Sequence, residues 1–375
     1  MSSYMEFIDL KSQQALIRKD LQERMDKVLA HGQYIMGPEV AESEKALCEF
    51  SGAKHAITCA SGTDALLMCM MALNLKPGDE VITTTFTFYA TVGMMVYLGV
   101  KPVLVDIDPR TCNVDVNQIE SKITSKTKVI LPVSLYGQCA DMEKINALAQ
   151  KHGIEVIEDA AQSFGARQRG KWSCNLTKLS CTSFFPAKPL GVYGDGGACF
   201  TNDDQLAHDL RAIRVHGSHE RYNHVRIGIN GRFDTLQAAI LISKLKVFPG
   251  ECESRERIGR QYNELFAEYC PSVKTPVTEE FNRHVYAQYT IRVPQREKVM
   301  AKLKDYGVPT VVHYPKSIHN QKVFSDLYGQ FYNDQKFPEA EKAAQEVMSL
   351  PMHPYVKKED QVTVAKAVAA VLKEI

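Results

Sequence analysis

Residues 128–159, KVILPVSLYGQCADMEKINALAQKHGIEVIED, carry the pattern from which the architecture follows. The apolar run at 128–135 predicts a buried strand, the amphipathic pattern at 142–152 predicts a helix, and 155–158 predicts another buried strand. Two parallel neighbouring strands need a crossover of this length, usually a helix. The stretch therefore predicts one unit of a mostly parallel sheet that is covered by helices on both faces.

The same alternation of helices and strands extends from residue 45 to residue 200 and then changes. Upstream, the sequence predicts helices at 64–75, 91–98 and 116–123 and strands after the GDE turn and at 102–107. Downstream, it predicts helices at 203–216, 234–247, 252–269, 295–306, 336–348 and 361–374, and a strand at 286–293. Phe248-Pro249-Gly250 is a stop signal, which we expect to end the helix at 234–247. We expect a large α/β lobe at 1–248, with an N-terminal helical arm, and a smaller α+β lobe at 249–375.

Composition narrows the class of protein. The 375 residues are 45% hydrophobic and 24% charged, with a formal net charge of +1. These values fit a globular chain and argue against a nucleic-acid surface or a polybasic membrane patch. Ten cysteines without a CxxC pair indicate buried thiols of a reducing compartment. The N-terminus lacks signal-peptide features and the longest apolar run, 65–73, cannot span a bilayer, so we expect a cytoplasmic protein without a membrane partner.

The segment Cys59-Ala60-Ser61-Gly62-Thr63-Asp64 follows a short predicted strand and opens a helix. Small residues at a helix N-terminus leave backbone N–H groups open, which suits a phosphate dianion, and Thr63 adds a hydroxyl donor. The alternative is an ordinary helix start with Ser61 or Thr63 as N-cap, and taken alone this segment favours that alternative.

The segment Glu158-Asp159-Ala160-Ala161-Gln162 ends another predicted strand. A buried carboxylate is costly unless it meets a cation, and the protonated nitrogen of a pyridine ring is such a partner for Asp159. Gln162 follows closely enough to approach the same ring. The alternative is an aspartate that caps the next helix.

The third segment, SFFPAKPLGVYGDGG at 183–197, places Lys188 among aromatic residues and glycines. Burial would lower the pKa of this amine and make it nucleophilic toward an aldehyde, while Ser183 could bind phosphate. The alternative is a loop lysine that points to solvent. In the fourth segment, TFTFYAT at 85–91, an aromatic side chain could stack on a flat ring, although for Phe86 we prefer core packing.

Together these segments resemble the sugar aminotransferases of the DegT/DnrJ/EryC1/StrS family, which have the aspartate aminotransferase fold (PLP fold type I). The resemblance extends in order from GQYIMGPEV at 32–40 through SGTDAL, EDAAQSFGA, SFFPAKPLGVYGDGG and GINGRFDTLQAAIL to VVHYP and SLPMHP. It implies a mostly parallel seven-stranded sheet between helices in the large lobe, and pyridoxal 5'-phosphate (PLP) as the cofactor.

The resemblance also implies a role for each site residue. Lys188 would hold the cofactor as a Schiff base and move protons, and Asp159 would pair with the ring nitrogen. Gln162 would face the ring or its oxygen and Phe88 would stack on it. The phosphate would be held by Gly62, Thr63 and Ser183. Asn230 in GINGR matches an asparagine that family members contribute to the partner's pocket, which implies a homodimer with shared active sites.

CNLTKLSCTSFFPAKPLG and SLYGQCADMEKINALA are similar to the subgroup that aminates C3 of UDP-2-acetamido-2-deoxy-3-oxo-glucuronic acid, with L-glutamate as donor, in surface polysaccharide synthesis. Under this reading Arg232 would meet an anionic group and His313 and Tyr314 would line the sugar pocket. Other dTDP- or UDP-linked 3- or 4-keto-6-deoxy sugars remain alternatives.

Three other classes of protein are alternatives to a sugar aminotransferase. A PLP sugar dehydratase is disfavoured because those relatives replace the lysine with histidine. A non-catalytic binding or regulatory protein is disfavoured by the intact set Asp159, Gln162, Ser183 and Lys188. A nicotinamide-dependent enzyme is disfavoured because no GxGxxG follows an early strand.

Overall fold

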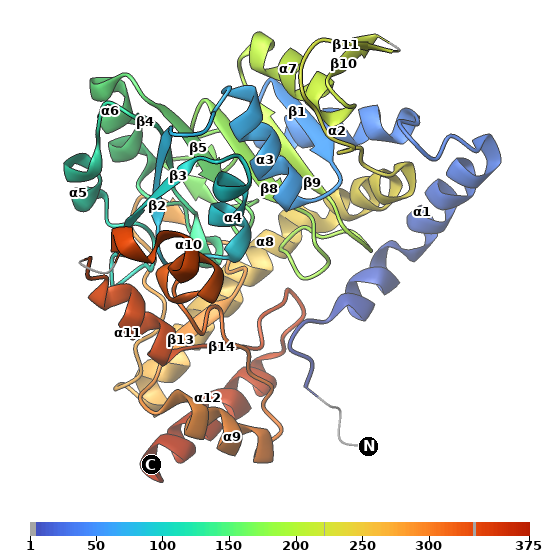
Figure 1. Ribbon diagram of the computed structural model, residues 1–375. Coiled ribbons are helices and arrows are strands. Elements are labelled where there is room, and N and C mark those ends of the chain that lie inside the picture. The colour runs from blue at the N-terminus through green and yellow to red at the C-terminus, as the bar shows by residue number, and fades with distance from the viewer. Residues whose placement is uncertain (1–4, 221, 333–334) are drawn as a thin grey trace.

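The computed structural model describes residues 5–220, 222–332 and 335–375, and its centre is a seven-stranded sheet (Figure 1). In spatial order the strands are β1 (His55–Cys59), β9 (Gly197–Thr201), β8 (Leu179–Ser183), β5 (Glu155–Asp159), β4 (Thr127–Leu131), β2 (Glu80–Thr84) and β3 (Lys101–Val105). All neighbours are parallel except β9, which is antiparallel to both β1 and β8. The expected α/β class with a mostly parallel sheet is confirmed.

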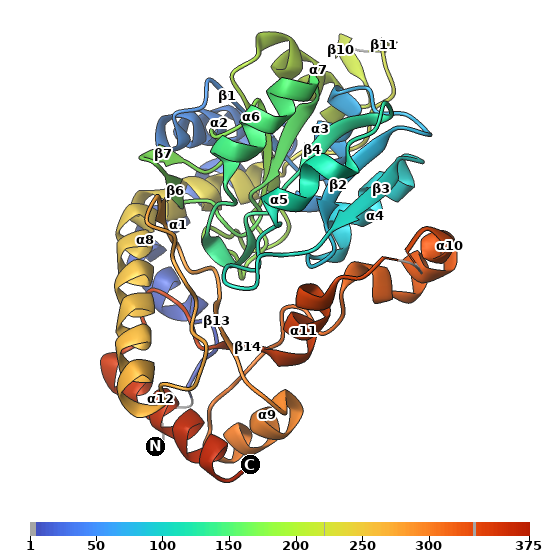
Figure 2. The ribbon, with the colours of Figure 1, turned by 90° about the vertical axis from the view of Figure 1, so that its left-hand side faces the viewer.

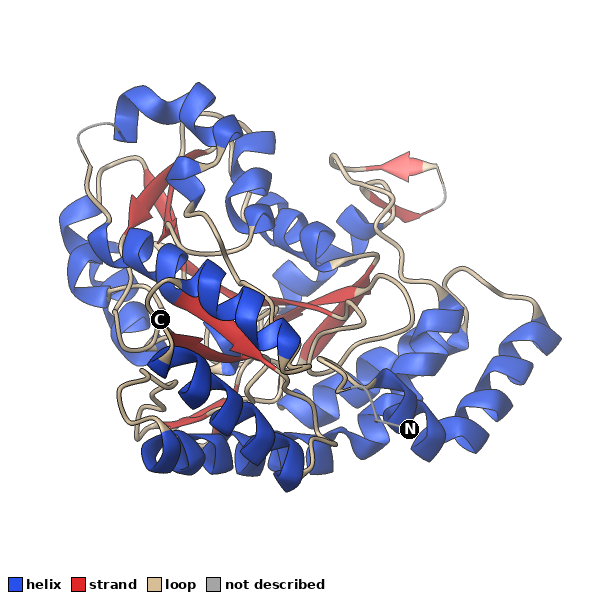
Figure 3. Cartoon of the chain, turned by 90° about the horizontal axis from the view of Figure 1, so that it is seen from below, coloured by secondary structure: helices blue, strands red, loops and turns tan. Residues whose placement is uncertain are grey.

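Helices cover both faces of this sheet, and the alternation of side chains along a strand explains why (Figure 3). On β5, Ile157 packs in a core with Met68, whereas its neighbour Val156 packs in another core with Ile145. The first face is covered by α3 (Gly62–Ala72), α4 (Tyr89–Tyr97) and α7 (Asp204–Arg214). The second face is covered by α2 (Pro38–Ser51), α6 (Met142–His152) and the first half of α8 (Thr235–Tyr269).

The smaller lobe is built on the second half of α8 (Figure 2). Tyr262 and Phe266 pack with the antiparallel pair β13 (Tyr289–Arg292) and β14 (Val347–Leu350). The other elements of this part of the chain are α9 (Arg296–Asp305), η3 (Ile318–Asn320), α10 (Lys322–Tyr332), α11 (Pro338–Glu346) and α12 (Lys358–Lys373). The segment from η3 to α11 also packs on the large lobe, where the Ile318 N–H donates to the Thr85 carbonyl at 2.7 Å.

Short elements complete the structure. They are α5 (Val116–Ile119), η1 (Glu120–Lys122), η2 (Leu135–Gly137), the sheet β12–β6–β7 (Asn282–Arg283, Arg167–Gln168, Lys171–Trp172) and the pair β10–β11 (Ser218–Glu220, Asn223–His224).

The N-terminal arm is α1 (Leu10–His31), and its docking surface is α8. Ile17 and Leu21 share a core with Phe248, and the Gln13 amide donates to Glu251 at 2.9 Å. The sequence predicted the helical arm, but it contained no signal for this docking surface.

The predicted helix stop at Phe248-Pro249-Gly250 is wrong, because α8 continues through it to Tyr269 and joins the two helices expected at 234–247 and 252–269. Pro249 removes one N–H donor, but it is exposed, so water can reach the carbonyl left behind. Phe248 and Cys252 are buried on either side, and Glu251 is held by α1. This packing overrides the local signal. We propose that the two lobes meet within α8, between Cys252 and Ile258, where the core changes.

Most other predicted elements appear within a few residues of their expected ends. The strand expected at 128–135 is shorter, since β4 ends at Leu131 and the chain then turns into η2. The ten cysteines are free thiols and nine of them are buried, as predicted. Among the described residues, no helix combines the length and apolar character that crossing a membrane requires.

Candidate active site

All four predicted segments meet at one edge of the sheet, where β1, β2, β5 and β8 end, and the fourth segment does so through Thr91, which hydrogen-bonds to Asp159. Gly62 lies against Ser183 so closely that an added Cβ would come within 2.6 Å of the Ser183 Cβ. The backbone after β1 therefore needs a glycine at this point to approach the end of β8. The Asp159 carboxylate and the Lys188 amine also interact electrostatically. Carboxyl ends of strands are where open α/β sheets bind ligands.

The phosphate-binding candidates form one corner of this edge. Ser61, not Thr63, is the N-cap of α3, and its hydroxyl accepts from the Asp64 N–H at 3.0 Å. Because a helix begins with N–H groups that have no intrahelical acceptor, those of Gly62 and Thr63 remain available to a ligand. The Ser183 hydroxyl accepts from the Phe185 N–H at 3.2 Å and keeps its own proton to donate. The corner thus offers several neutral donors at a helix N-terminus.

Asp159 ends β5 and is buried, at 3% exposure. Its carboxylate accepts from the Thr91 hydroxyl at 2.8 Å and from the Ala161 N–H at 3.1 Å. Burial raises the pKa of this carboxyl, and these two donors and Lys188 only partly oppose the rise. A carboxylate in this environment is stabilised by a cation placed against it. Thr91 was not predicted, because it lies far from Asp159 in the sequence.

Lys188 lies in the loop between β8 and β9, which is folded tightly. Its N–H donates to the Phe185 carbonyl at 2.9 Å, and a Cβ at Gly191 would come within 2.5 Å of the same oxygen. The side chain is partly exposed by surface area, yet burial lowers the pKa of its amine, and Asp159 opposes this shift. More of this amine is neutral near pH 7 than in an ordinary lysine, so it is a better nucleophile.

Gln162 is held between the two lobes. It lies in a turn, where its side-chain oxygen accepts from the Tyr136 N–H at 2.7 Å and its amide donates to the Tyr314 hydroxyl at 2.9 Å. Tyr136 was not predicted, and its φ of 58° gave no local signal in the sequence. Its hydroxyl donates to the His313 carbonyl. Tyr136 therefore positions both Gln162 and the segment that carries His313 and Tyr314.

The aromatic candidates differ in exposure. Phe88 is 54% exposed and its ring lies 5.9 Å from that of Tyr314, so one face is open for a flat ligand. Phe86 is fully buried in a core, as expected. His313 is close enough to Lys188 for the amine to lower its pKa, although burial is the larger cause, and the two bring that pKa to about 4. The imidazole is therefore neutral near pH 7.

Asn230 and Arg232 lie elsewhere on the chain. They line a hollow of about 430 Å³ together with Asp195 and Gln237, and Lys188 is not part of its lining. The Asn230 side chain is exposed, and the Arg232 Nε is buried without a hydrogen-bond partner among the described residues. Asn230 and Arg232 flank Gly231, whose carbonyl accepts from the Ala60 N–H at 3.0 Å next to the phosphate corner, but Lys188 does not line their hollow.

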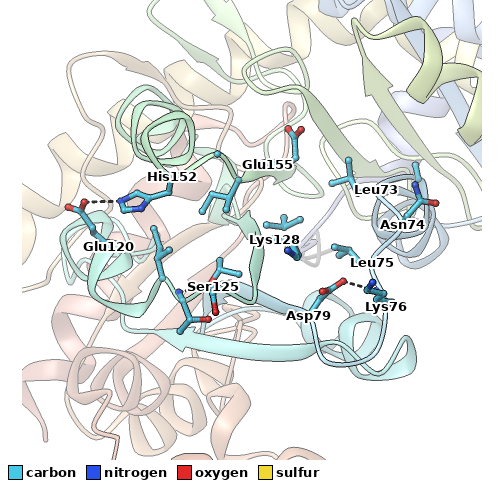
Figure 4. Close-up of a pocket in the computed structure, with 17 residues that line it drawn as sticks. Leu73, Asn74, Leu75, Lys76, Asp79, Glu120, Ser125, Lys128, His152 and Glu155 are labelled. Atoms are coloured by element: carbon cyan, nitrogen blue, oxygen red, sulfur yellow. Dashed lines mark hydrogen bonds and ion pairs between the residues drawn. The ribbon is translucent and has the colours of Figure 1, made fainter.

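A larger cavity, of about 900 Å³, opens at the opposite edge of the sheet, where β2, β4 and β5 begin (Figure 4). Lys76, Lys128, His152 and Glu155 lie on its walls, and none of the predicted site residues does. Within the part of the chain that the structure describes, no cluster of His, Cys, Asp or Glu could hold a metal ion.

The residues of this group fit pyridoxal phosphate. The helix corner with Gly62, Thr63 and Ser183 offers donors for a dianion, and Lys188 offers an amine for an aldehyde. The raised pKa of Asp159 fits a carboxylate whose cationic partner comes from a ligand. Each polar end of the cofactor has a complementary group, and Phe88 offers a ring face.

Comparisons with known proteins point the same way. The model of the DegT/DnrJ/EryC1/StrS aminotransferase family matches residues 15–369. A UDP-2-acetamido-2-deoxy-3-oxo-D-glucuronate aminotransferase from Pseudomonas aeruginosa is 55% identical over 94% of this chain and 96% of its own length.

Two further matches bear on the reading of the site. A protein from Geobacillus stearothermophilus named "pleiotropic regulatory protein" is 46% identical over 96% of this chain and 97% of its own length. Among solved structures, NtdA from Bacillus subtilis with bound cofactor PMP superposes with a TM-score of 0.89 at 33% identity, over 98% of this chain and 83% of that one.

Proposed function

Because the chain belongs to the DegT/DnrJ/EryC1/StrS aminotransferase family, we propose that it transfers an amino group from L-glutamate to C3 of UDP-2-acetamido-2-deoxy-3-oxo-glucuronic acid. The observation that carries this proposal is the 55% identity to an aminotransferase of that sugar over nearly the full length of both chains. A product of this kind would serve surface polysaccharides such as a lipopolysaccharide O-antigen, and we propose a cytoplasmic homodimer as its source.

Pyridoxal phosphate, when bound, supplies an aldehyde and an electron-accepting ring. In this proposal Lys188 attaches the cofactor through its amine, which the lowered pKa makes more nucleophilic. When it is not attached to the cofactor, the Lys188 amine would be the group that accepts and returns the proton of the donor α-carbon. General acid–base work of this kind contributes about 10²–10⁴-fold to a rate.

Asp159 keeps the ring nitrogen protonated in this scheme. Its carboxylate is oriented by the Thr91 hydroxyl and the Ala161 N–H, so little reorganisation is needed when a positive charge arrives. Gln162 faces the ring from a side chain that Tyr136 and Tyr314 already hold. Phe88 stacks on the ring, and Gly62, Thr63 and Ser183 hold the phosphate.

We assign the sugar side of the pocket to His313, Tyr314 and Arg232. The neutral imidazole of His313 can donate or accept a hydrogen bond without adding charge beside Lys188. Arg232 is suited to a carboxylate, either that of the donor or that of the uronate, because its guanidinium can bind in a bidentate way. Its Nε is buried and has no hydrogen-bond partner among the residues that the structure describes, which fits a guanidinium that binds a ligand oxygen.

The position of Asn230 supports a shared site. Its side chain is exposed and lines a hollow that does not include Lys188 of its own chain, which fits a residue that completes the partner's cofactor pocket. Mixing two inactive variants tests this. Lys188→Ala and Asn230→Ala homodimers should each be impaired, whereas random reassortment should restore about a quarter of wild-type activity, since half the dimers regain one intact site. A mixture no more active than its components would contradict the shared site.

A panel of keto-sugars tests the substrate. The purified enzyme with PLP and L-glutamate should aminate the UDP-linked 3-oxo-glucuronate, and the amine should appear at C3 of the product. UDP- and dTDP-linked 3- or 4-keto-6-deoxy sugars should react at least ~10-fold less efficiently, because they lack the carboxylate assigned to Arg232. A better rate with a 6-deoxy sugar would replace the proposed substrate and leave the aminotransferase activity standing.

The regulatory name of one relative raises a second candidate, a cofactor-binding protein without turnover. The reaction of the bound cofactor with glutamate alone distinguishes the aminotransferase from this second candidate. Glutamate should convert the bound cofactor to its amine form, with loss of the aldehyde absorption band. Bound PLP that stays unchanged with excess glutamate would favour the regulatory candidate.

A further inference from the structure

A second cavity, of about 470 Å³, lies between the two lobes. We call it the interlobe cavity. Its walls are residues 109–112, Tyr136 and Gln138 from the large lobe, and residues 273–277, His284, Thr290, Arg292 and Val347 from the smaller lobe. Its volume lies within the range of small-molecule sites, about 300–1,000 Å³. None of the residues assigned to the cofactor or the sugar lines it.

The charges on the walls of the interlobe cavity have one sign. Arg110, Lys274 and Arg292 line it, and no carboxylate does. The acids that pair with the arginines, Glu279 and Glu346, are not part of the lining. These two acids offset the charges of the two arginines, so the remaining excess of positive charge, which favours an anion, is that of Lys274.

Arg292 is the most informative of these residues. Its side chain is only 8% exposed, its Nε donates to Glu346 at 3.0 Å, and one terminal nitrogen donates to the Pro109 carbonyl at 3.1 Å. The other terminal nitrogen, Nη2, is buried and has no partner among the described residues. A buried donor on a charged group is costly to leave unpaired, so an acceptor is expected beside it.

His284 adds a neutral donor to the same wall. Its Nδ1 accepts from the Tyr286 N–H at 2.8 Å, so the proton of the neutral ring is on Nε2. Burial lowers its pKa to about 3, and the ring therefore stays neutral at pH 7. The rest of the wall is apolar at Val273, Val277 and Val347. A ligand would meet cationic and neutral donors on one part of the wall and hydrocarbon on another.

We infer that the interlobe cavity binds a small organic oxyanion, a carboxylate or a phosphate with an apolar portion. This site is separate from that of the proposed reaction, although Tyr136 contacts residues of both. Tyr136 lines the cavity, while its N–H holds Gln162 and its hydroxyl holds the His313 carbonyl.

Titration calorimetry on the PLP-loaded enzyme tests the inference, since bound cofactor blocks its own phosphate site. Phenyl phosphate and sodium benzoate represent the two sources of the oxyanion, and benzyl alcohol is the uncharged control. At least one anion should bind once per chain, the alcohol should not bind, and saturating UDP should not compete. No heat with either anion, or displacement by UDP, would overturn the inference.

Two variants place the binding in the interlobe cavity. Lys274→Glu reverses an exposed charge and should fold normally, and it should weaken the anion by ~10-fold. Arg292→Lys removes Nη2 and should weaken it further. Lys304→Glu reverses an exposed lysine outside the cavity and should bind like the parent. If Lys274→Glu and Lys304→Glu bind the anion equally well, the anion does not bind in the interlobe cavity and the inference is wrong.

Discussion

At the scale of single residues, the site depends on two groups that burial affects in opposite ways. Burial makes the Lys188 amine easier to deprotonate and the Asp159 carboxyl easier to protonate. Each of them opposes the shift of the other, because their charges attract. A cofactor that binds covalently to the amine and presents a cation to the carboxylate satisfies both needs.

Replacement of Lys188 tests the first of these groups. Lys188→Ala should reduce turnover by about 10²–10⁴-fold, because both the attachment and the proton carrier are lost. The absorption band of the attached cofactor should disappear, although PLP can still bind through its phosphate. Lys178→Ala is the matched control, because Lys178 lies at the other end of β8 and forms only an exposed pair with Glu155. Normal transamination by Lys188→Ala would exclude the assigned role.

Asp159→Asn should separate catalysis from folding. Burial raises the folded-state pKa of Asp159, so the stability it contributes is fully present below its unfolded value and is lost as pH rises through the folded pKa. At pH 8 the cofactor-free variant should therefore melt about 1–3 °C higher than the cofactor-free parent. Its turnover with PLP should fall by ~10²-fold or more, because the ring nitrogen loses its partner.

Calorimetric melting and steady-state rates measure the two effects of Asp159→Asn. A variant that melts well below the parent without cofactor would show that the carboxylate is satisfied by its own chain. The Thr91 hydroxyl and the Ala161 N–H would then be sufficient partners.

Residues whose chemistry is local could be predicted from the sequence. Asp159 stands out as an acid at the end of an apolar strand, and Lys188 stands out as an amine among aromatic residues and glycines. Thr91 and Tyr136 could not be predicted, since each acts through a partner that is distant in the sequence. The interlobe cavity could not be predicted either, because its large-lobe and smaller-lobe walls come from segments that are 135 or more residues apart.

At the scale of elements, α8 shows where local signals fail. The strand and helix alternation before residue 200 gave the sheet and its covering helices, because each element follows a short-range period. Pro249-Gly250 is an equally local signal, but its outcome depends on packing by Phe248, Cys252 and the arm α1. α8 consequently continues into the smaller lobe and carries the core of both lobes (Figure 2).

Two glycines of α8 allow a paired prediction. Gly250 is exposed and an added Cβ would meet nothing within 4 Å, so Gly250→Ala should stabilise the protein by about 0.5–1 kcal/mol. Gly259 lies against Tyr286, where a Cβ would come within 2.5 Å of the ring, so Gly259→Ala should destabilise it. Urea denaturation of both variants measures the difference. Equal effects would mean that helix propensity, not packing, decides at both positions.

At the scale of the whole molecule, the two lobes should respond differently to acid. The large lobe buries carboxyls whose pKa burial raises, such as Glu158 and Asp159. The smaller lobe buries histidines whose pKa burial lowers, to about 3 for His284 and about 4 for His313 and His353. In acid, the histidines of the smaller lobe bind protons more readily when that lobe is unfolded, so acid favours its unfolding. The carboxyls of the large lobe bind protons more readily when that lobe is folded, so acid does not favour its unfolding in this way.

The stability contributed by these histidines is fully present above their unfolded pKa, about 6.5, and is lost as pH falls toward 4. Each histidine should lower the free energy of unfolding by about 1.4 kcal/mol per pH unit between its unfolded and its folded pKa. Far-UV circular dichroism reports on both lobes, whereas Trp172, the single tryptophan, lies on β7 in the large lobe. Urea unfolding followed by circular dichroism and by Trp172 fluorescence should give the same transition at pH 7. At pH 5 the dichroism should change at a lower urea concentration than the fluorescence.

Replacement of His284 tests whether this residue contributes to the acid response of the smaller lobe. His284→Asn keeps an acceptor for the Tyr286 N–H but cannot take up a proton. It should be less stable than the parent at pH 7, because the ring stacked on Tyr286 is lost. Its further loss between pH 7 and pH 5 should nevertheless be smaller than that of the parent by about 2 kcal/mol. If parent and variant lose the same stability over this range, His284 does not titrate on unfolding, and the acid response must come from the other buried groups of the smaller lobe.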